Sequence, residues 1–285
     1  MKIYLLEIEK RFQPSKQAFN YPVHNRDYGI EQDFLVYIQN NNLLTNNPEE
    51  ADWHYLPVFW THWHLDHDYG KTGLEELRSG INSAILDEKK TFTVCQYDDG
   101  PVIETGKIKV FLGSRKTING YDAPLLSSNH KLPLFKPTKK YLGSFVGRTS
   151  THSIREDLHA SLKNDSRFLF VDGSLGEKFF VKVMLQSLVA LCPRGYGGSS
   201  FRFYEAMQIG VVPFQIGDID TRPFKKSIKW DEFSFYTNDA AKVRDIILSK
   251  SKTELLEMGK KAKAFYKSDI CYQKWCSHLI KELEL

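Results

Sequence analysis

The sequence predicts two α/β domains, each a parallel sheet covered by helices on both faces. Short apolar runs alternate with segments of helical periodicity along most of the chain, and polar clusters directly follow several of these runs. The alternation breaks at 132–140 (LPLFKPTKK), where two prolines and a basic run intervene. We therefore expect a first domain over 1–135 and a second over 136–265, facing each other across a cleft. A terminal helix over 266–285 is expected to return to the first domain.

The expected elements follow from local pattern. Leu74, Leu77 and Ile81 recur at helical spacing, as do Ile154, Leu158 and Leu162 in a second helix, for which Ser153 and Glu156 read as a capping box. The chain turns helical and charged after Asp239. The apolar runs expected as strands are KIYLLEI (2–8), DWHYLPVFW (52–60), FTVCQYD (92–98), IKVFLG (108–113), YLGSFVG (141–147), RFLFVDG (167–173), SLVALCP (187–193) and GVVPFQIG (210–217).

Composition excludes several classes. The net charge of +4, from 39 basic and 35 acidic residues, is too small to indicate nucleic-acid binding. The four cysteines form no C-x-x-C pair, which favours a reducing compartment. The N-terminal run is interrupted by Glu7 and Glu9, so it predicts a first strand and neither a signal peptide nor a membrane span. We expect a cytoplasmic protein, unless the chain is a piece of a longer one.

The segment PRGYGGSSFRFYEAMQIGVVPF (193–214) carries the clearest site pattern. A Gly-rich loop follows a buried run and opens an expected helix over 201–209, closed by Gly210. Glycines let the backbone approach a ligand, and the first N–H groups of a helix attract anions. Arg202 on the first turn can pair with phosphate oxygens, and Glu205 on the same face can accept hydrogen bonds from ribose hydroxyls. A phosphate or nucleotide site is predicted; a structural Gly-rich turn is the alternative.

The second half resembles the exostosin-type glycosyltransferases of family 47. The run from Cys192 contains C-P-R-G, then S-x-R-x-x-E-A (200–206), V-P-F, an Asp, P-F and W-x-x-F-S, in the order of that family's pattern. The segments FVGR (145–148) and SIR (153–155) are similar to its F-x-G…I-R stretch, and NPEEADWHYLPVFW (47–60) to its P-x-E-A-D stretch. YDDG (97–100) stands where the family has H-D-W-G, and the chain is short and lacks the membrane anchor of Golgi members.

The resemblance implies a GT-B fold and an inverting, metal-independent transfer of a sugar from a UDP-sugar to a glycan hydroxyl, with no cofactor. A neutral hexose or a pentose such as xylose is expected, because no clear basic slot for a carboxylate is visible. A nucleotide sugar and a glycan are therefore the expected partners. The donor-binding residues implied are Arg148, Arg155, Gly195, Gly197, Gly198, Ser200, Arg202 and Glu205, with Asp218 matching a family Asp.

The stretch THWHLDHDYG (61–70) also matches the first zinc-binding motif of metallo-β-lactamase-type hydrolases. Such a site needs a further His about sixty residues on, and His130 is the one candidate at a tolerable distance, but it lacks the expected P-G-H-T turn. The alternating α/β elements also do not fit the β-sandwich fold of these hydrolases. A zinc hydrolase is therefore the alternative. A protein that binds UDP without transferring sugar is a third possibility. Two D-x-D pairs, 66–68 and 218–220, could hold a metal on a diphosphate, but Arg202 and a helix N-terminus make one unnecessary.

On the glycosyltransferase reading, the same stretch is a strand-end loop of the first domain that helps bind the acceptor. An inverting transfer needs one general base and groups that orient the acceptor hydroxyl. We expect Asp66 or Asp99 as base and His62 as the orienting group. The acceptor-binding candidates are Trp60, Trp63, His64, His67 and Asp98, with the two tryptophans stacking on sugar rings.

Overall fold

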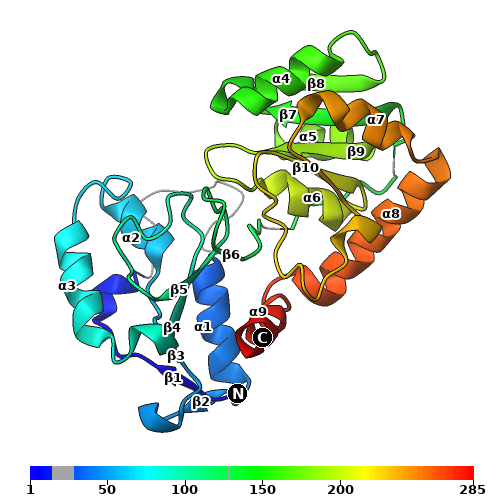
Figure 1. Ribbon diagram of the computed structural model, residues 1–285. Helices are drawn as coiled ribbons and strands as arrows, with labels where there is room; N and C mark the ends of the chain where they lie inside the picture. Colours follow the sequence, from blue (N-terminus) through cyan, green and yellow to red (C-terminus); the bar gives the residue numbers. More distant parts are fainter. Residues whose placement is uncertain (15–28, 128, 136) are drawn as a thin grey trace. The chain divides into compact units, whose positions relative to one another are not determined.

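The computed structural model describes residues 1–14, 29–127, 129–135 and 137–285 (Figure 1). Contacts divide the chain into two units: unit 1 is Met1–Ser128 with Tyr272–Leu285, and unit 2 is Asn129–Cys271. Each unit is built on one parallel sheet with helices, so the predicted α/β class and the return of the C-terminal helix to the first half are confirmed. The sequence predicted domain boundaries after residues 135 and 265, and in the structure the chain passes from one unit to the other after residues 128 and 271.

Unit 1 has a six-stranded sheet in the order β2-β1-β3-β4-β5-β6. Its strands are β1 (Ile3–Leu5), β2 (Leu44–Thr45), β3 (Trp53–Tyr55), β4 (Thr91–Cys95), β5 (Lys109–Leu112) and β6 (Tyr121–Asp122). Its helices are α1 (Ile30–Asn40), α2 (Trp60–Asp66), α3 (Leu74–Ala84) and α9 (Cys276–Glu284). Helices α1 and α9 lie side by side (Figure 1), and the Phe34 ring packs 5.9 Å from that of Trp275.

Unit 2 has a five-stranded sheet in the order β11-β10-β9-β7-β8. Its strands are β7 (Tyr141–Gly147), β8 (Phe168–Asp172), β9 (Ser187–Pro193), β10 (Val212–Ile216) and β11 (Phe235–Thr237). Its helices are α4 (Ser153–Leu162), α5 (Glu177–Leu185), α6 (Phe201–Ile209), α7 (Val243–Leu248) and α8 (Lys252–Phe265). Right-handed crossovers from β7 to β8 and from β9 to β10 run in opposite directions along the sheet, which puts α4 and α6 on opposite faces.

Each unit has its own apolar core. The core of unit 2 lies between its sheet and helices α4, α7 and α8, with Phe145, Val189 and Phe214 among its buried residues. In unit 1, Leu6, Phe12 and Trp60 belong to the corresponding cluster under α2 and α3. Within the described ranges, no helix combines the length and apolar character that crossing a membrane requires.

Two local predictions are wrong. The segment after β3 is helix α2 and not a strand-end loop, because Trp60, Trp63, His64 and His67 recur three to four residues apart. The N-cap of α4 is His152, whose Nδ1 accepts a hydrogen bond of 3.2 Å from the Ile154 N–H. Ser153 is therefore the first helical residue, and the capping box proposed for it does not form.

Candidate functional site

The carboxyl edge of the unit 2 sheet has a topological switch point between β7 and β9, because the chain leaves these neighbouring strands in opposite directions. Ligands of doubly wound sheets bind at such points. Arg148 follows β7, and the Gly-rich loop 195–200 follows β9 and leads into α6. The segment singled out in the sequence therefore lies at the switch point of this unit.

Helix α6 begins and ends as predicted. Ser200 is its N-cap in extended conformation, and Gly210 closes it with φ 83°, in the left-handed region that suits glycine. Gly195, Gly197, Gly198 and Ser200 are all buried, whereas Tyr196 between them is 72% exposed. The loop thus presents one aromatic ring to solvent while its glycines pack against the protein.

Two arginines converge beside this loop. The Arg202 guanidinium lies 5.0 Å from the centre of the Phe145 ring, and that of Arg155 lies 5.5 Å from it. Arg202 donates to the Val146 carbonyl and, at 3.3 Å, to the Ser200 hydroxyl. Gly147 makes room for it, since a Cβ there would overlap the guanidinium and lie 2.9 Å from its Cζ.

Arg155 is 6% exposed and donates to three backbone carbonyl groups: to those of Arg194 and Arg148 at 2.8 Å, and to that of Pro193 at 3.3 Å. It therefore ties the ends of β7 and β9 together, which is a structural role beyond the phosphate contact expected for it. Within the described ranges, neither Arg155 nor Arg202 has a hydrogen bond or ion pair to a carboxylate.

The electrostatics of this pair favour an anion. Burial, together with the neighbouring Arg202 charge, lowers the pKa of Arg155 to about 10. Burial also lowers the pKa of Arg202, against the opposing influence of Glu205. Both groups stay protonated at neutral pH, so the site holds two positive charges in a poorly solvated place. A third guanidinium, Arg148, is exposed and without a side-chain partner in the part of the chain that the structure describes.

Glu205 on α6 is held by a histidine that the sequence did not connect with it. Its Oε1 lies 3.0 Å from His130 Nε2, and both side chains are 5% exposed. The other ring nitrogen of His130 lies 3.2 Å from Glu177 Oε1 on α5. Burial lowers the pKa of His130, but the hydrogen bonds and charges of the two glutamates outweigh it, so that the pKa is raised overall. A carboxylate on each side favours the imidazolium form.

The D-x-D pair of unit 2 is engaged by arginines. Asp218 is in an ion pair with Arg194, and the Asp220 carboxylate accepts two hydrogen bonds from the Arg222 guanidinium, of 3.0 and 2.9 Å. The charge and hydrogen bond of Arg194 lower the pKa of Asp218 although partial burial opposes this. Both carboxylates therefore already have cationic partners.

The first-half residues lie differently from what was expected. Trp60 is 0% and Trp63 3% exposed, and both belong to the apolar core of unit 1. The Trp60 indole donates to the Thr93 hydroxyl at 2.9 Å, and Trp63 stacks on the His67 ring with centroids 3.8 Å apart. The prediction that these tryptophans stack on a sugar is wrong, because one face of α2 buries them.

The histidines of α2 point to different partners. His62 contacts the Gln32 amide at 3.1 Å and the Pro14 carbonyl at 3.3 Å. His64 is fully buried, and burial lowers its pKa to about 4. His67 binds the Trp63 carbonyl through Nδ1 at 2.8 Å. Among the described residues, no three His, Cys, Asp or Glu side chains come together as a metal site, so the zinc motif finds no support in this geometry.

The expected bases are accessible. Asp66 is exposed at the end of α2, and Asp99 is exposed and in an ion pair with Lys116. Nothing in the geometry selects one of these two. Asp98, which was expected to bind the acceptor, is half-buried.

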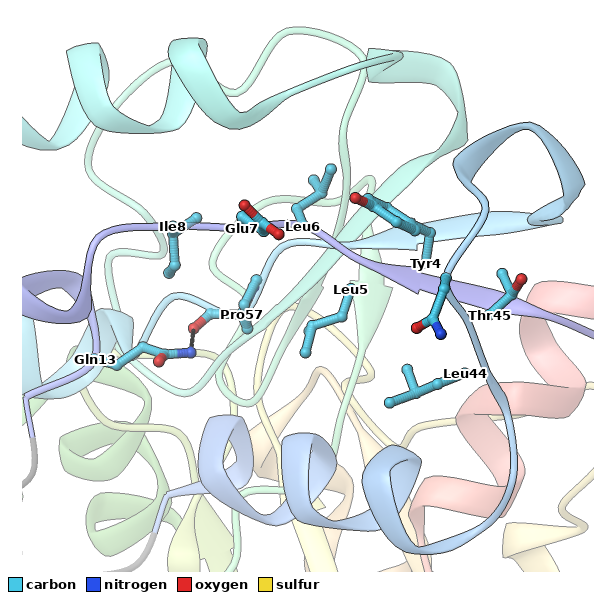
Figure 2. Close-up of a pocket in the computed structure, with 10 residues that line it drawn as sticks. Tyr4, Leu5, Leu6, Glu7, Ile8, Gln13, Leu44, Thr45 and Pro57 are labelled. Carbon is cyan, nitrogen blue, oxygen red and sulfur yellow. Dashed lines mark hydrogen bonds between the residues drawn. The ribbon is translucent and has the colours of Figure 1, made fainter.

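Unit 1 also contains a pocket that the sequence did not reveal, of about 640 Å³ (Figure 2). It is lined by residues of β1, of the end of β2 and of the segments that follow β1 and β3, namely Tyr4, Leu5, Leu6, Glu7, Ile8, Gln13, Leu44, Thr45, Asn46 and Pro57. No sequence pattern links these short segments, because they meet only through strand order.

Comparisons with known proteins find similarity to glycosyltransferases. Residues 113–249 match the Exostosin GT47 domain model. A probable glucuronosyltransferase of Oryza sativa subsp. japonica is 22% identical over 87% of this chain and 71% of its own length. The exostosin-1 homolog of Caenorhabditis elegans is 21% identical (93% and 80%), and a probable β-1,4-xylosyltransferase of Arabidopsis thaliana is 20% identical (84% and 68%).

Two solved structures are similar at a lower level. Anabaena HepE in complex with UDP-glucose has 12% identity and a TM-score of 0.39, with all of both chains covered. TarM has 14% identity and a TM-score of 0.39, and the match spans 74% of this chain and 57% of TarM. The family match covers the second sheet through α7, including the arginine pair and the Gly-rich loop. The chain is therefore a glycosyltransferase whose residues 113–249 match the Exostosin GT47 domain.

Proposed function

We propose that the protein transfers a sugar from a UDP-sugar to a hydroxyl group of a glycan, with inversion and without a metal ion. The observation that carries the proposal is the pair of guanidiniums, Arg155 and Arg202, beside the Gly-rich loop. Their charge is balanced by no hydrogen-bonded carboxylate among the described residues. A diphosphate at this point would supply the missing negative charge, and the N–H groups of the α6 N-terminus would add to its binding.

The roles of individual residues follow from position. Arg202 and the exposed Arg148 would neutralise the diphosphate, which leaves with the electron pair of the broken glycosidic bond. Arg155 would act chiefly by fixing the loops after β7 and β9. Glu205, whose Oε1 lies 3.0 Å from His130 Nε2, would accept hydrogen bonds from the ribose hydroxyls.

Metal independence is supported by the D-x-D pair at 218–220. Its two carboxylates are engaged by Arg194 and Arg222, and a Mn²⁺ ion would have to displace these arginines before it could use them. The buried guanidiniums provide the positive charge that the metal supplies in metal-dependent enzymes. Inversion requires a single base on the acceptor hydroxyl, for which Asp66 and Asp99 stay candidates.

The donor sugar is proposed to be a neutral hexose or a pentose such as xylose. The relatives described above include both a probable glucuronosyltransferase and a probable xylosyltransferase. Arg148 is exposed at this edge of the sheet, so its guanidinium could bind the carboxylate of a glucuronate donor and not the diphosphate. A panel of UDP-sugars, assayed by hydrolysis without acceptor and repeated with Arg148→Ala, separates these donors. A cytoplasmic location stays a prediction from the sequence.

Calorimetric titration with UDP tests the donor site. Arg202→Ala should weaken UDP binding by about ten- to a hundredfold, because a charge-assisted hydrogen bond contributes roughly 1.5–3 kcal/mol. Arg167→Ala is the matched control, since Arg167 is half exposed and pairs with Asp165 in the same unit. Equal UDP affinity for the Arg202→Ala variant and the wild type would refute the assignment. UDP binding without turnover of any donor would instead favour the catalytically inactive alternative.

A further inference from the structure

The pocket of unit 1 lies at the switch point of its sheet. The chain leaves β1 toward β2 through α1 and leaves β3 toward β4 in the opposite direction, so the switch point falls between β1 and β3. The pocket is lined by the segments that follow these strands, Leu6–Ile8 and Pro57, and by the end of β2. Ligand sites of doubly wound sheets are expected at this place.

The strand lengths explain why the space is open. Strand β2 pairs only Leu44 and Thr45 with Ile3 and Tyr4, whereas β1 continues to pair with β3 at Leu5. Among the described residues, no strand therefore pairs with this flank of the chain beyond Tyr4, where β2 has ended. At the far end, the Gln13 amide donates to the Pro57 carbonyl at 2.9 Å and fixes that wall (Figure 2).

The lining combines apolar walls with polar groups that have bonding capacity left. Leucines, Ile8 and Pro57 supply the apolar surface. In the described part of the chain, neither the Tyr4 hydroxyl nor the Glu7 carboxylate has a hydrogen-bond partner, and the Asn46 amide has none either. The volume of about 640 Å³ falls within the range of roughly 300–1,000 Å³ that small-molecule sites occupy. Apolar walls with scattered hydroxyl, amide and carboxylate groups match the alternating faces and hydroxyls of a sugar.

The charge of the lining narrows the class further. Glu7 is the one carboxylic acid among the ten lining residues, and none of the ten is basic. An anionic saccharide would meet an unbalanced carboxylate and no cation, which is unfavourable. A neutral saccharide can donate its hydroxyl hydrogens to Glu7 and Asn46.

We propose that this pocket binds a neutral acceptor saccharide and that Glu7 receives a hydrogen bond from one of its hydroxyls. This inference rests on the proposed function, because the saccharide is an acceptor only if the protein is a glycosyltransferase. It places the acceptor in this pocket and not at α2, whose tryptophans are buried. It concerns sugar binding in unit 1, and UDP binding concerns unit 2, so each can fail without the other.

The test titrates the full chain with xylotetraose, cellotetraose and tetragalacturonate, followed by ligand-observed NMR, with UDP titrated in parallel. At least one neutral tetrasaccharide should bind, and tetragalacturonate should bind at least about tenfold more weakly or not at all. Glu7→Gln should weaken the neutral ligand by about tenfold, as expected for the loss of a hydrogen bond to a charged group. Leu44→Trp, from a residue that is 39% exposed at the pocket, should fill the space and abolish binding.

Two controls separate pocket effects from general ones. Glu75→Gln changes an exposed glutamate of α3, with 84% of its side chain accessible, and should leave saccharide affinity unchanged. All variants should keep the wild-type affinity for UDP. The proposal is overturned if no tetrasaccharide binds, if tetragalacturonate binds as well as the neutral ones, or if Glu7→Gln and Leu44→Trp both bind like wild type. If the wild type does not bind UDP, the donor-site proposal is refuted, whereas the pocket proposal is still decided by the saccharide titrations.

Discussion

His130 offers a direct test of how α6 is held at the donor site. The change His130→Gln removes a cation that lies between Glu205 and Glu177, at 3.0 and 3.2 Å. Glu205 is 5% exposed, and losing the partner of a buried charge costs roughly 3–5 kcal/mol. Glu177 is 50% exposed, so its share should be about 0–1 kcal/mol. Because Glu205 keeps its electrostatic interaction with Arg202, we expect the lower end of this range, a loss of about 3 kcal/mol in the free energy of opening this region.

The assay is amide hydrogen exchange of α6 at increasing urea, which reports the opening of this helix. A double-mutant cycle with Glu205→Gln isolates the pair: the double variant should lose at least about 1.5 kcal/mol less than the sum of the single variants. Strict additivity would refute the idea that His130 and Glu205 act as an ion pair.

The stability that His130 contributes should depend on pH in one direction. The pKa of His130 is raised in the folded protein, so its contribution is complete below the unfolded value of about 6.5 and is lost as pH rises through the folded pKa. The stability difference between wild type and His130→Gln should therefore be largest at mildly acidic pH and shrink in alkaline buffer. A difference that grows with pH would contradict the charged form.

Two further predictions test other parts of the molecule. Gly147→Ala should displace the Arg202 guanidinium and reduce UDP affinity as Arg202→Ala does. The control Gly176→Ala, whose Cβ would meet nothing within 4 Å, should leave UDP affinity unchanged. Equal UDP affinities for the two variants would contradict this prediction. Burial is the main cause that raises the pKa of Asp33 to about 7, so the free energy of unfolding of the wild type should fall as pH rises from about 4 to 7. Asp33→Asn should remove this pH dependence. In urea unfolding at pH 8, the variant should be more stable than the wild type by up to about 4 kcal/mol. An unchanged slope in Asp33→Asn would assign the pH dependence to another group.

The parts that could be predicted are those in which local pattern and tertiary burial agree. The runs YLGSFVG and SLVALCP coincide with β7 and β9, because central parallel strands are buried on both faces and are written as continuous apolar runs. Gly210 marked the end of α6 because few other residues adopt its φ of 83°. The Gly-rich loop and Arg202 lie together at the switch point because they are adjacent in the chain.

The parts that could not be predicted depend on pairings between distant segments. His130 lies 75 residues from Glu205, and no periodicity connects them. In α2, the run of aromatic and histidine residues looked like a polar loop, but its three- and four-residue spacing places Trp60 and Trp63 in the core. The pocket around Glu7 depends on β2 being only two residues long, a length set by tertiary packing.

The C-terminal return has a practical consequence for dissecting the molecule. Unit 2 is one continuous stretch, 129–271, inserted between two pieces of unit 1. A stop codon after 271 would leave Phe34 without the Trp275 ring and the Trp53 indole without the Leu283 carbonyl, 3.2 Å away. Unit 2 is thus the half that can be cloned as a single fragment to test the proposed donor binding. Unit 1 calls for a fusion that joins 1–127 to 272–285 through a short linker, or for adding the last fourteen residues as a peptide and measuring whether it restores the fold.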